Sequence, residues 1–157
     1  MSYNGKIMSN TSSHLVVILR GISGAGKSSY AKKHYPDAVV CSADNFFIQK
    51  DGTYKFRADL LGKAHQQCHD NFVKALRDKT RRIVVDNTNT KRREYGWYLQ
   101  DARNYGYDVL FVRLDTPVSV AAERNAHGVP LDAVQRMADR MDEVPEGCLE
   151  IVVSGTE

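Results

Sequence analysis

The sequence predicts an α/β fold built on a parallel β-sheet, and two observations lead to this prediction. Short apolar runs of strand length alternate along the chain with longer segments in which apolar residues recur every three or four positions. A glycine-rich stretch, GISGAGKSS, separates the first apolar run from the first helical segment. Parallel strands are joined by long crossovers, usually helices, so this alternation is typical of a sheet flanked by helices.

Two strands and two helices are expected in the first half of the chain. The run LVVIL at 15–19 is apolar throughout, as a strand buried on both faces should be. A helix is expected at Ser28–His34, a second strand at 38–42 and a loop over Asn45–Arg57. A longer helix is expected at Asp59–Lys79, because apolar residues share one of its faces. These apolar residues are Leu61, Ala64, Cys68, Phe72 and Ala75.

Three strands and three helices are expected in the second half of the chain. The runs RIVVD and DVLFVRL have the composition of buried strands, and Gly106 ends the helix between them. Pro117 suits the first turn of the next helix, and the stretch HGVP interrupts the helical pattern before it resumes. The expected elements are strands at 82–86, 108–114 and 149–153 and helices at 91–105, 117–126 and 131–141.

The length and composition fit one globular domain. With 157 residues, the chain is expected to form a single domain at 14–157 that follows a flexible tail at 1–13. Hydrophobic residues make up 42% of the chain and charged residues 26%, as in ordinary soluble proteins. The net charge of +3 permits an anionic partner but is too small to indicate one. No pattern in the sequence indicates an oligomeric state.

The cysteines and the hydropathy of the chain indicate its compartment. Cys41, Cys68 and Cys148 are odd in number and have no C-x-x-C spacing, which is typical of reduced thiols rather than a disulfide framework. No apolar run has the length needed to span a bilayer, and the opening stretch MSYNGKIMSNTSS lacks the apolar core of a signal peptide. A cytoplasmic protein without a membrane partner is therefore expected.

The stretch GISGAGKSS matches the Walker A pattern G-x-x-x-x-G-K-[ST] of phosphate-binding loops, or P-loops. The backbone amides of such a loop point at the β-phosphate of a nucleotide, and the following helix adds its positive N-terminal end. Lys27 is expected to bridge the β- and γ-phosphates, and the Ser28 hydroxyl to hold Mg²⁺. The expected nucleotide is ATP, or another nucleoside triphosphate. The expected nucleotide-binding residues are Gly21, Ser23, Gly24, Ala25, Gly26, Lys27, Ser28 and Ser29.

Two aspartates at the ends of strands are candidate site residues. Asp86 ends the third strand, where an acid beside a P-loop strand orders the water shell of the metal ion. Asp44 follows the second strand, and its carboxylate could accept a proton from an attacking hydroxyl or aim that hydroxyl at the γ-phosphorus. Asp86 could instead merely end its strand, and Asp44 could form a turn or a helix cap. For Asp44 the residues alone favour neither interpretation.

Three arginines near the stretch HGVP are candidates for contact with phosphate. A guanidinium group suits the transition state of phosphoryl transfer because it brings positive charge to the transferred group. Arg124 is the arginine for which we favour this catalytic role. Arg136 and Arg140 are four residues apart on the next helix, where they could contact substrate or line a solvated face and pair weakly with Asp132.

Two further stretches are candidate substrate contacts. Lys91 and Arg92 open a helix, where cations oppose the helix macrodipole, so they could contact substrate phosphates. Surface solubility is the commoner reason for such a basic run. In the loop after Asp44, aromatic and basic residues interleave, a combination that can stack bases and hold phosphates. Tyr54 and Arg57 are the expected substrate contacts there, whereas Phe46 and Phe47 are expected to pack on the core.

Four stretches in order resemble one known family. GISGAGKSS, CSADNFF, VVDNTNT and AERNAHGVPLDAVQRM together are similar to the small P-loop kinases related to phage polynucleotide kinase. They look closest to the kinase-like domains of the ubiquitin-ligase-binding protein group. The resemblance extends from about Leu15 to Met141. It implies a P-loop NTPase fold with a five-stranded parallel sheet of order 2-3-1-4-5 and a mobile helical lid at 126–141.

The resemblance also implies an activity and roles for several residues. The family transfers the γ-phosphate of ATP to a 5′-hydroxyl of DNA or RNA, so a nucleic acid 5′ end is the implied partner. Asp44 matches the general base of the family, Asp86 the acid near substrate and metal, and Arg124 the lid arginine. The phage pattern has an arginine shortly after the base, where this chain has Asn45-Phe46-Phe47, and a second lid arginine, where it has His127-Gly128. The residues that could replace these arginines are Arg57, Arg136 and Arg140.

Three functions are therefore open at this point. The first is an ATP-dependent kinase for a polynucleotide 5′-hydroxyl. The second uses the same residues for a small acceptor such as a nucleoside, a sugar or an antibiotic. The third is a binding module that responds to nucleotide and transfers little phosphate. The position of Asp44 argues against the binding module, because a protein that only responds to nucleotide does not require a carboxylate where a kinase has its base.

Overall fold

Residues 13–125 and 128–156 are described in a computed structural model of the protein. The first twelve residues of the expected tail lie outside the described residues, and so does Ala126, the expected end of one helix.

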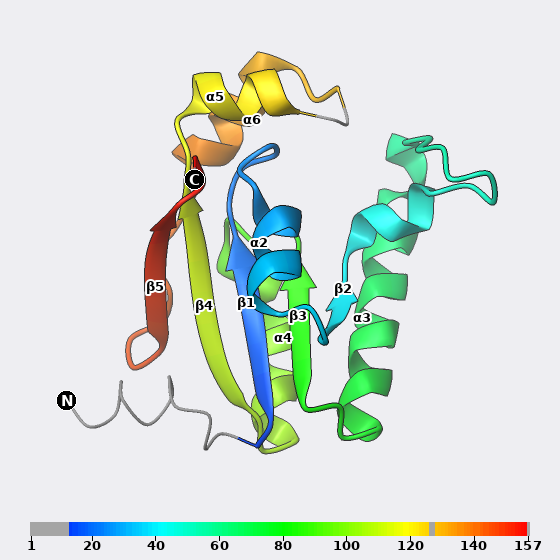
Figure 1. Ribbon diagram of the computed structural model, residues 1–157, viewed down its shortest axis with the longest axis vertical. Coiled ribbons are helices and arrows are strands. Elements are labelled where there is room, and N and C mark those ends of the chain that lie inside the picture. The colour runs from blue at the N-terminus through cyan, green and yellow to red at the C-terminus, as the bar shows by residue number, and fades with distance from the viewer. Residues whose placement is uncertain (1–12, 126–127, 157) are drawn as a thin grey trace.

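The centre of the fold is a five-stranded sheet whose strands all run parallel (Figure 1). Its strand order is β2-β3-β1-β4-β5, which confirms the order implied by the family resemblance. β1 pairs with β3 on one side and with β4 on the other, so the loop that follows β1 begins at the middle of the sheet. The strands are β1 (Leu15–Arg20), β2 (Val39–Cys41), β3 (Arg82–Asp86), β4 (Asp108–Asp115) and β5 (Leu149–Ser154).

Helices flank the sheet on both faces (Figure 1). α3 and α4 pack on one face and α2 packs on the other. α5 and α6 lie beyond the carboxyl ends of β1 and β4, and α6 falls within the expected lid at 126–141. The α-helices are α2 (Lys27–His34), α3 (Leu61–Arg77), α4 (Arg92–Asn104), α5 (Val118–Arg124) and α6 (Leu131–Asp139), and the 3₁₀ helices are η1 (Ala43–Phe47) and η2 (Ala58–Leu60).

The alternation of side chains along β1 builds two cores. Val16 and Ile18 face the side covered by α3 and α4, and Val17 and Leu19 face the side covered by α2 and α6. All four side chains are fully buried. The loop after β1 therefore starts from a strand that is packed on both faces.

The predicted helix at 59–79 differs from the structure at both ends. Its first residues form η2, and α3 begins at Leu61, whose side chain is 40% exposed instead of lying on the buried face. α3 ends before Lys79, because Lys79 adopts a left-handed conformation with φ of 58°. The amide of Thr80 then donates to the carbonyl of Ala75, a capping pattern that usually forms around a glycine.

The loop expected at 45–57 is partly ordered, so this prediction was wrong in part. Its first residues belong to η1, and Ile48 forms an isolated antiparallel bridge with Tyr54. Phe47 is 2% exposed and contacts the rings of Tyr54 and Phe56. Phe46 packs against the same core, which confirms the expectation for these two phenylalanines. The aromatic contacts hold the segment against the sheet although it contains little regular structure.

The remaining helices and strands begin and end within about two residues of the predicted positions.

The three cysteines are free thiols in the structure. Burial beside Cys68 raises the pKa of Cys41 to about 12. Within the described ranges, no helix is both long and apolar enough to cross a membrane.

Candidate functional site

The GISGAGKSS stretch forms a tight loop between β1 and α2. Gly24 and Gly26 have φ of 84° and 104°, a region that other residues rarely adopt. A Cβ atom on Gly24 would lie 2.1 Å from the carbonyl oxygen of Ala121, so the loop passes directly against α5. On the other side, the Thr116 hydroxyl donates a 2.9 Å hydrogen bond to the carbonyl of Ala25. Contacts from α5 and from Thr116, the residue after β4, thus hold the loop backbone in its shape.

Lys27 is the first residue of α2, directly after this loop, and lies in the field of two carboxylates. Its ammonium group donates hydrogen bonds of 2.9 and 3.0 Å to the carbonyls of Gly21 and Ile22. Burial lowers the pKa of Lys27 from its ordinary value, and the charges of Asp86 and Asp44 oppose this shift. Phosphates bound in the loop would add negative charge and favour the charged ammonium group further.

Ser28 and Asp86 meet at the start of α2. The Ser28 hydroxyl donates a 2.7 Å hydrogen bond to Oδ2 of Asp86. The two residues come together because β3 pairs with β1 and places Asp86 opposite Leu19, shortly before the loop. Asp86 is 8% exposed, so its carboxylate is held by the sheet and directed at the loop.

The pair of Ser28 and Asp86 fits a magnesium ion. Mg²⁺ prefers oxygen donors and is commonly held by one or two carboxylates together with substrate phosphates. A hydroxyl and a carboxylate joined at 2.7 Å beside a phosphate-binding loop supply such a donor set. Among the residues that the structure describes, no cluster of three or more histidines, cysteines and acids offers a separate metal site.

Asp44 lies in the first turn of η1, after the end of β2. Its backbone amide is capped by the Ser42 hydroxyl at 3.3 Å, and the amide of Ala43 donates to Oδ1 of Asn87 at 2.9 Å. The Tyr54 hydroxyl donates a 3.3 Å hydrogen bond to Oδ1 of Asp44. Burial and the Asp44 charge raise the pKa of Tyr54 to about 12, so the phenol stays a donor at neutral pH. Asp44 is therefore not the residue that caps this helix, because Ser42 has that role.

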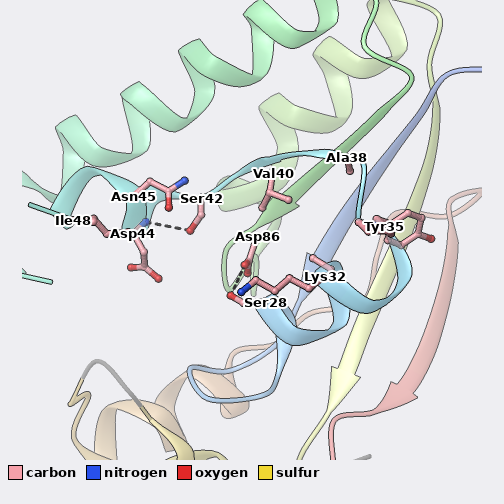
Figure 2. Close-up of a pocket in the computed structure, with 12 residues that line it drawn as sticks. Ser28, Lys32, Tyr35, Ala38, Val40, Ser42, Asp44, Asn45, Ile48 and Asp86 are labelled. Carbon is pink, nitrogen blue, oxygen red and sulfur yellow. Dashed lines mark hydrogen bonds between the residues drawn. The ribbon is translucent and has the colours of Figure 1, made fainter. Parts of the chain in front are cut away.

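A cavity of about 420 Å³ opens between α2, β2 and η1. Figure 2 shows Asp44 on one side of this cavity and Ser28 with Asp86 on the other. Carboxylates therefore lie on both sides of the cavity, and apolar side chains also contribute to its lining. The lining residues with polar groups in their side chains are Ser28, Lys32, Tyr35, Ser42, Asp44, Asn45 and Asp86.

Arg124 lies beside the P-loop and outside this cavity. It is the last residue of α5, and its Nη2 atom donates a 2.7 Å hydrogen bond to the carbonyl of Gly155. Its Nη1 atom lies 3.6 Å from the position that a Cβ atom on Gly26 would occupy. The Ser23 hydroxyl contacts Oδ1 of Asn125 at 3.4 Å, so the end of α5 touches the loop at a second point. This placement directs Arg124 toward a nucleotide in the loop.

Several predicted substrate residues do not reach the cavity. Arg57 pairs with Asp59 at 2.8 Å, and both side chains are more than half exposed. Arg136 pairs with Asp132 at 3.0 Å, also in solvent, which is the arrangement of a solvated helix face. An exposed arginine can pair with an acid that is close in sequence, and such a pair changes the free energy of folding little. The side chains of Arg57 and Arg136 therefore lie with these local partners and not in the cavity.

The basic residues at the start of α4 are also absent from the cavity lining. Lys91 is the N-cap residue of α4, and the backbone amide of Arg92 donates to Oδ2 of Asp142 at 2.9 Å. Asp142 thereby supplies the negative charge that the start of this helix favours. Tyr54 does not line the cavity, but its hydroxyl donates a hydrogen bond to Asp44, which does.

Arg20 and the NTNT stretch are structural parts of the site that sequence reasoning missed. Arg20 is the last residue of β1 and is fully buried. It donates to the carbonyls of Asn89 and Thr90 at 2.9 and 3.2 Å and pairs with Asp142 at 2.6 Å and Glu150 at 2.9 Å. A signal was present, because an arginine at the end of an otherwise apolar strand requires buried partners.

The NTNT stretch at 87–90 holds the P-loop and η1 in place. The amide of Gly21 donates to the carbonyl of Thr88 at 3.1 Å, and Nδ2 of Asn89 donates to the carbonyl of Leu19 at 2.7 Å. Asn89 has a φ of 48°, a conformation that asparagine tolerates better than most residues. The polar run after RIVVD thus positions both the loop and Asp44, through the contact of Asn87 with Ala43.

We expect Gly24→Ala to lower the free energy of unfolding by roughly 2 kcal/mol and to weaken ATP binding by at least about tenfold. The added methyl group would need a left-handed backbone and would overlap the carbonyl of Ala121. Urea denaturation and titration with a fluorescent ATP analogue measure the two effects. Gly62→Ala in α3 is the matched control, because no atom lies within 4 Å of the new methyl group. ATP affinity unchanged in Gly24→Ala would contradict the shape assigned to the loop.

Comparison with known proteins gives one family model and several relatives. A model described as an AAA domain matches residues 16–144. Human NEDD4-binding protein 2 is 33% identical over 132 residues, which cover 80% of this chain and 7% of that protein. The chain thus spans only a small part of the length of this relative.

Solved structures share the fold at low sequence identity. A chain of the Pnkp1/Rnl/Hen1 RNA repair complex superposes with a TM-score of 0.66 at 19% identity, covering 84% of this chain and 46% of that one. A gluconokinase from Sinorhizobium meliloti superposes with a TM-score of 0.61 at 16% identity, covering 93% and 85%. These likenesses show a P-loop kinase-like fold. With the matched model covering most of the sequence, the chain belongs to the AAA domain family.

Proposed function

We propose that the protein is an ATP-dependent kinase that transfers the γ-phosphate to a 5′-hydroxyl of a polynucleotide, DNA or RNA. The observation that carries this proposal is the placement of Asp44 across one cavity from Ser28 and Asp86. A hydroxyl in the cavity can approach Asp44 while phosphates lie in the loop that contains Lys27. The cavity therefore provides room for an acceptor next to a donor site.

In the proposed reaction, the oxygen of the acceptor hydroxyl forms a bond to the γ-phosphorus while the bond from this phosphorus to the bridging oxygen of ADP breaks. Asp44 aims the hydroxyl and receives its proton. Lys27 offsets the negative charge on the phosphates, and Arg124 adds charge from the α5 side of the loop. Mg²⁺ bound with ATP would neutralise further phosphate charge, and Ser28 and Asp86 are the residues that would hold it.

The cavity lining favours a nucleotide-like acceptor over a free sugar. Apolar side chains, among them Ala38, Val40 and Ile48, form part of the cavity wall. A free sugar presents hydroxyls on all sides and leaves them unpaired against such a wall, whereas a nucleoside presents an apolar base face. The fold is shared with a chain of an RNA repair complex and with a gluconokinase alike, so the choice between acceptors rests on the cavity lining. The free thiols of Cys41, Cys68 and Cys148 support a cytoplasmic location for the protein.

Transfer of label from γ-labelled ATP tests the proposed function. In the presence of Mg²⁺, we expect label on an oligonucleotide with a 5′-hydroxyl and none on the same oligonucleotide with a 5′-phosphate, which lacks the acceptor group. Rising salt should reduce transfer to the oligonucleotide, because cations compete for its phosphates. Parallel reactions contain mixed nucleosides, gluconate or water alone.

Two outcomes would contradict the proposal in different ways. Label on nucleosides or gluconate alone would identify a kinase for small acceptors, in line with the fold shared with a gluconokinase. Binding of ATP without label on any acceptor would identify a nucleotide-dependent binding module.

A further inference from the structure

The acceptor cavity contains two carboxylates and needs a cation if its substrate is anionic. Asp44 and Asp86 both line it. A nucleic acid strand carries a phosphate close to the sugar whose hydroxyl reacts, and two carboxylates without a nearby cation would repel that phosphate. The P-loop ammonium of Lys27 is engaged by the loop carbonyls and belongs to the donor side.

The arginines suggested by the sequence are occupied elsewhere. Arg57 and Arg136 pair with carboxylates on their own segments. Arg140 donates from Nε to the Thr90 hydroxyl at 3.0 Å and lies 3.8 Å from Glu94. None of these three side chains lines the cavity.

Lys32 is the cationic side chain that lines it. Lys32 lies on α2 one turn after Ser28, so the two side chains share a face of the helix. Figure 2 shows it on the side of the cavity formed by Ser28 and Asp86. Within 13–125 and 128–156, no hydrogen-bond or ion-pair partner holds the exposed Lys32 side chain. Its ammonium group is therefore available to a ligand.

Helix stability alone does not account for the position of Lys32. The last turn of α2 contains Lys32, Lys33 and His34, and cations there interact favourably with the helix macrodipole. Lys33 provides the same benefit but does not line the cavity. A comparison of variants at Lys32 and Lys33 can therefore distinguish the effect of a positive charge on helix stability from its effect on a ligand in the cavity.

We propose that Lys32 binds the phosphate of the acceptor strand that is attached to the reacting nucleoside, while Asp44 receives the 5′-hydroxyl. Lys32 then distinguishes phosphate-bearing acceptors from neutral nucleosides and sugars. This inference rests on the proposed kinase function, because it places the acceptor in the same cavity. Lys32 is a specificity-determining residue and takes no part in the bonds that form and break.

The test compares two acceptors and three variants. The acceptors are a nucleoside 3′-monophosphate and the same nucleoside without phosphate, and the variants are Lys32→Gln, Lys32→Arg and Lys33→Gln. We expect Lys32→Gln to raise KM for the nucleoside 3′-monophosphate by about 10-fold to 100-fold, as loss of a hydrogen bond to a charged group does, with little change in kcat. Its kcat/KM for the neutral nucleoside should stay within about twofold. Lys32→Arg should keep most of the discrimination, and Lys33→Gln should behave like the unmodified protein.

Calorimetric binding of the same two ligands without ATP separates this inference from the kinase function. If phosphate is transferred but Lys32→Gln and Lys33→Gln have equal KM values, the role of Lys32 is overturned and the kinase function stands. If nothing is transferred but Lys32→Gln alone loses affinity for the nucleoside 3′-monophosphate, the phosphate contact stands and the kinase function fails. Equal binding by both variants without any transfer would reject both.

Discussion

Replacement of Asp44 by asparagine is expected to lower kcat for phosphoryl transfer by about 10²-fold to 10⁴-fold, the usual contribution of a positioned general base. Asparagine keeps the shape of the side chain but cannot receive the proton of the acceptor hydroxyl. The Ser42 cap on η1 and the contact between Ala43 and Asn87 use the backbone, so the local fold should survive. ATP affinity is expected to stay within a few-fold, because Asp44 lies across the cavity from the P-loop.

Single-turnover transfer and equilibrium binding of ATP measure the two quantities separately. Asp70→Asn is the control, since Asp70 is an exposed carboxylate on α3 whose partner is Gln66. It should change neither quantity. If Asp44→Asn loses ATP binding together with transfer, Asp44 supports the structure of the site, and the proposed base is wrong.

Replacement of Arg20 by methionine is expected to lower the free energy of unfolding by about 3 kcal/mol, the lower end of the cost of breaking a buried ion pair. Methionine fills much of the volume but leaves the carboxylates of Asp142 and Glu150 and three backbone carbonyl groups without their donor. The lower end applies because Asp142 and Glu150 are 26% and 16% exposed and keep some contact with water. For a chain of this length the melting temperature should fall by about 10 °C.

Urea denaturation compares this variant with Arg136→Met, which removes an exposed pair to Asp132. The control should cost no more than about 0.5 kcal/mol. Lysine at position 20 should restore only part of the stability, because it cannot bond five separate acceptor atoms with the fixed geometry of a guanidinium group. A loss below about 1 kcal/mol in Arg20→Met would show that the network contributes little.

Local patterns in the sequence were sufficient for the sheet and for the donor side of the site. Apolar runs between helical segments predicted five strands, and the family resemblance supplied their order. The Walker A spacing predicted the loop, in which Gly24 and Gly26 have positive φ, and the end of β3 predicted a carboxylate beside Ser28. These features depend on residues that are close in sequence or on the rule that parallel strands end at one edge.

Boundaries and caps were less predictable. Lys79 ends α3 in a conformation usually given to glycine, and η1 replaced the first part of an expected loop. Both depend on contacts of the surrounding chain, which override the weak preference of single residues.

The sequence by itself determined that this protein has a phosphate-binding loop on a parallel sheet, because backbone geometry, glycine and short-range pattern decide those features. Only the tertiary structure decided which cations serve the site. Arg57 and Arg136 pair with acids on their own segments. Lys32 lies on the face of α2 that lines the cavity. Arg20 pairs with Asp142, which is 122 positions away in the sequence. A long charged side chain can reach several partners, so its role depends on which of them the folded chain brings near.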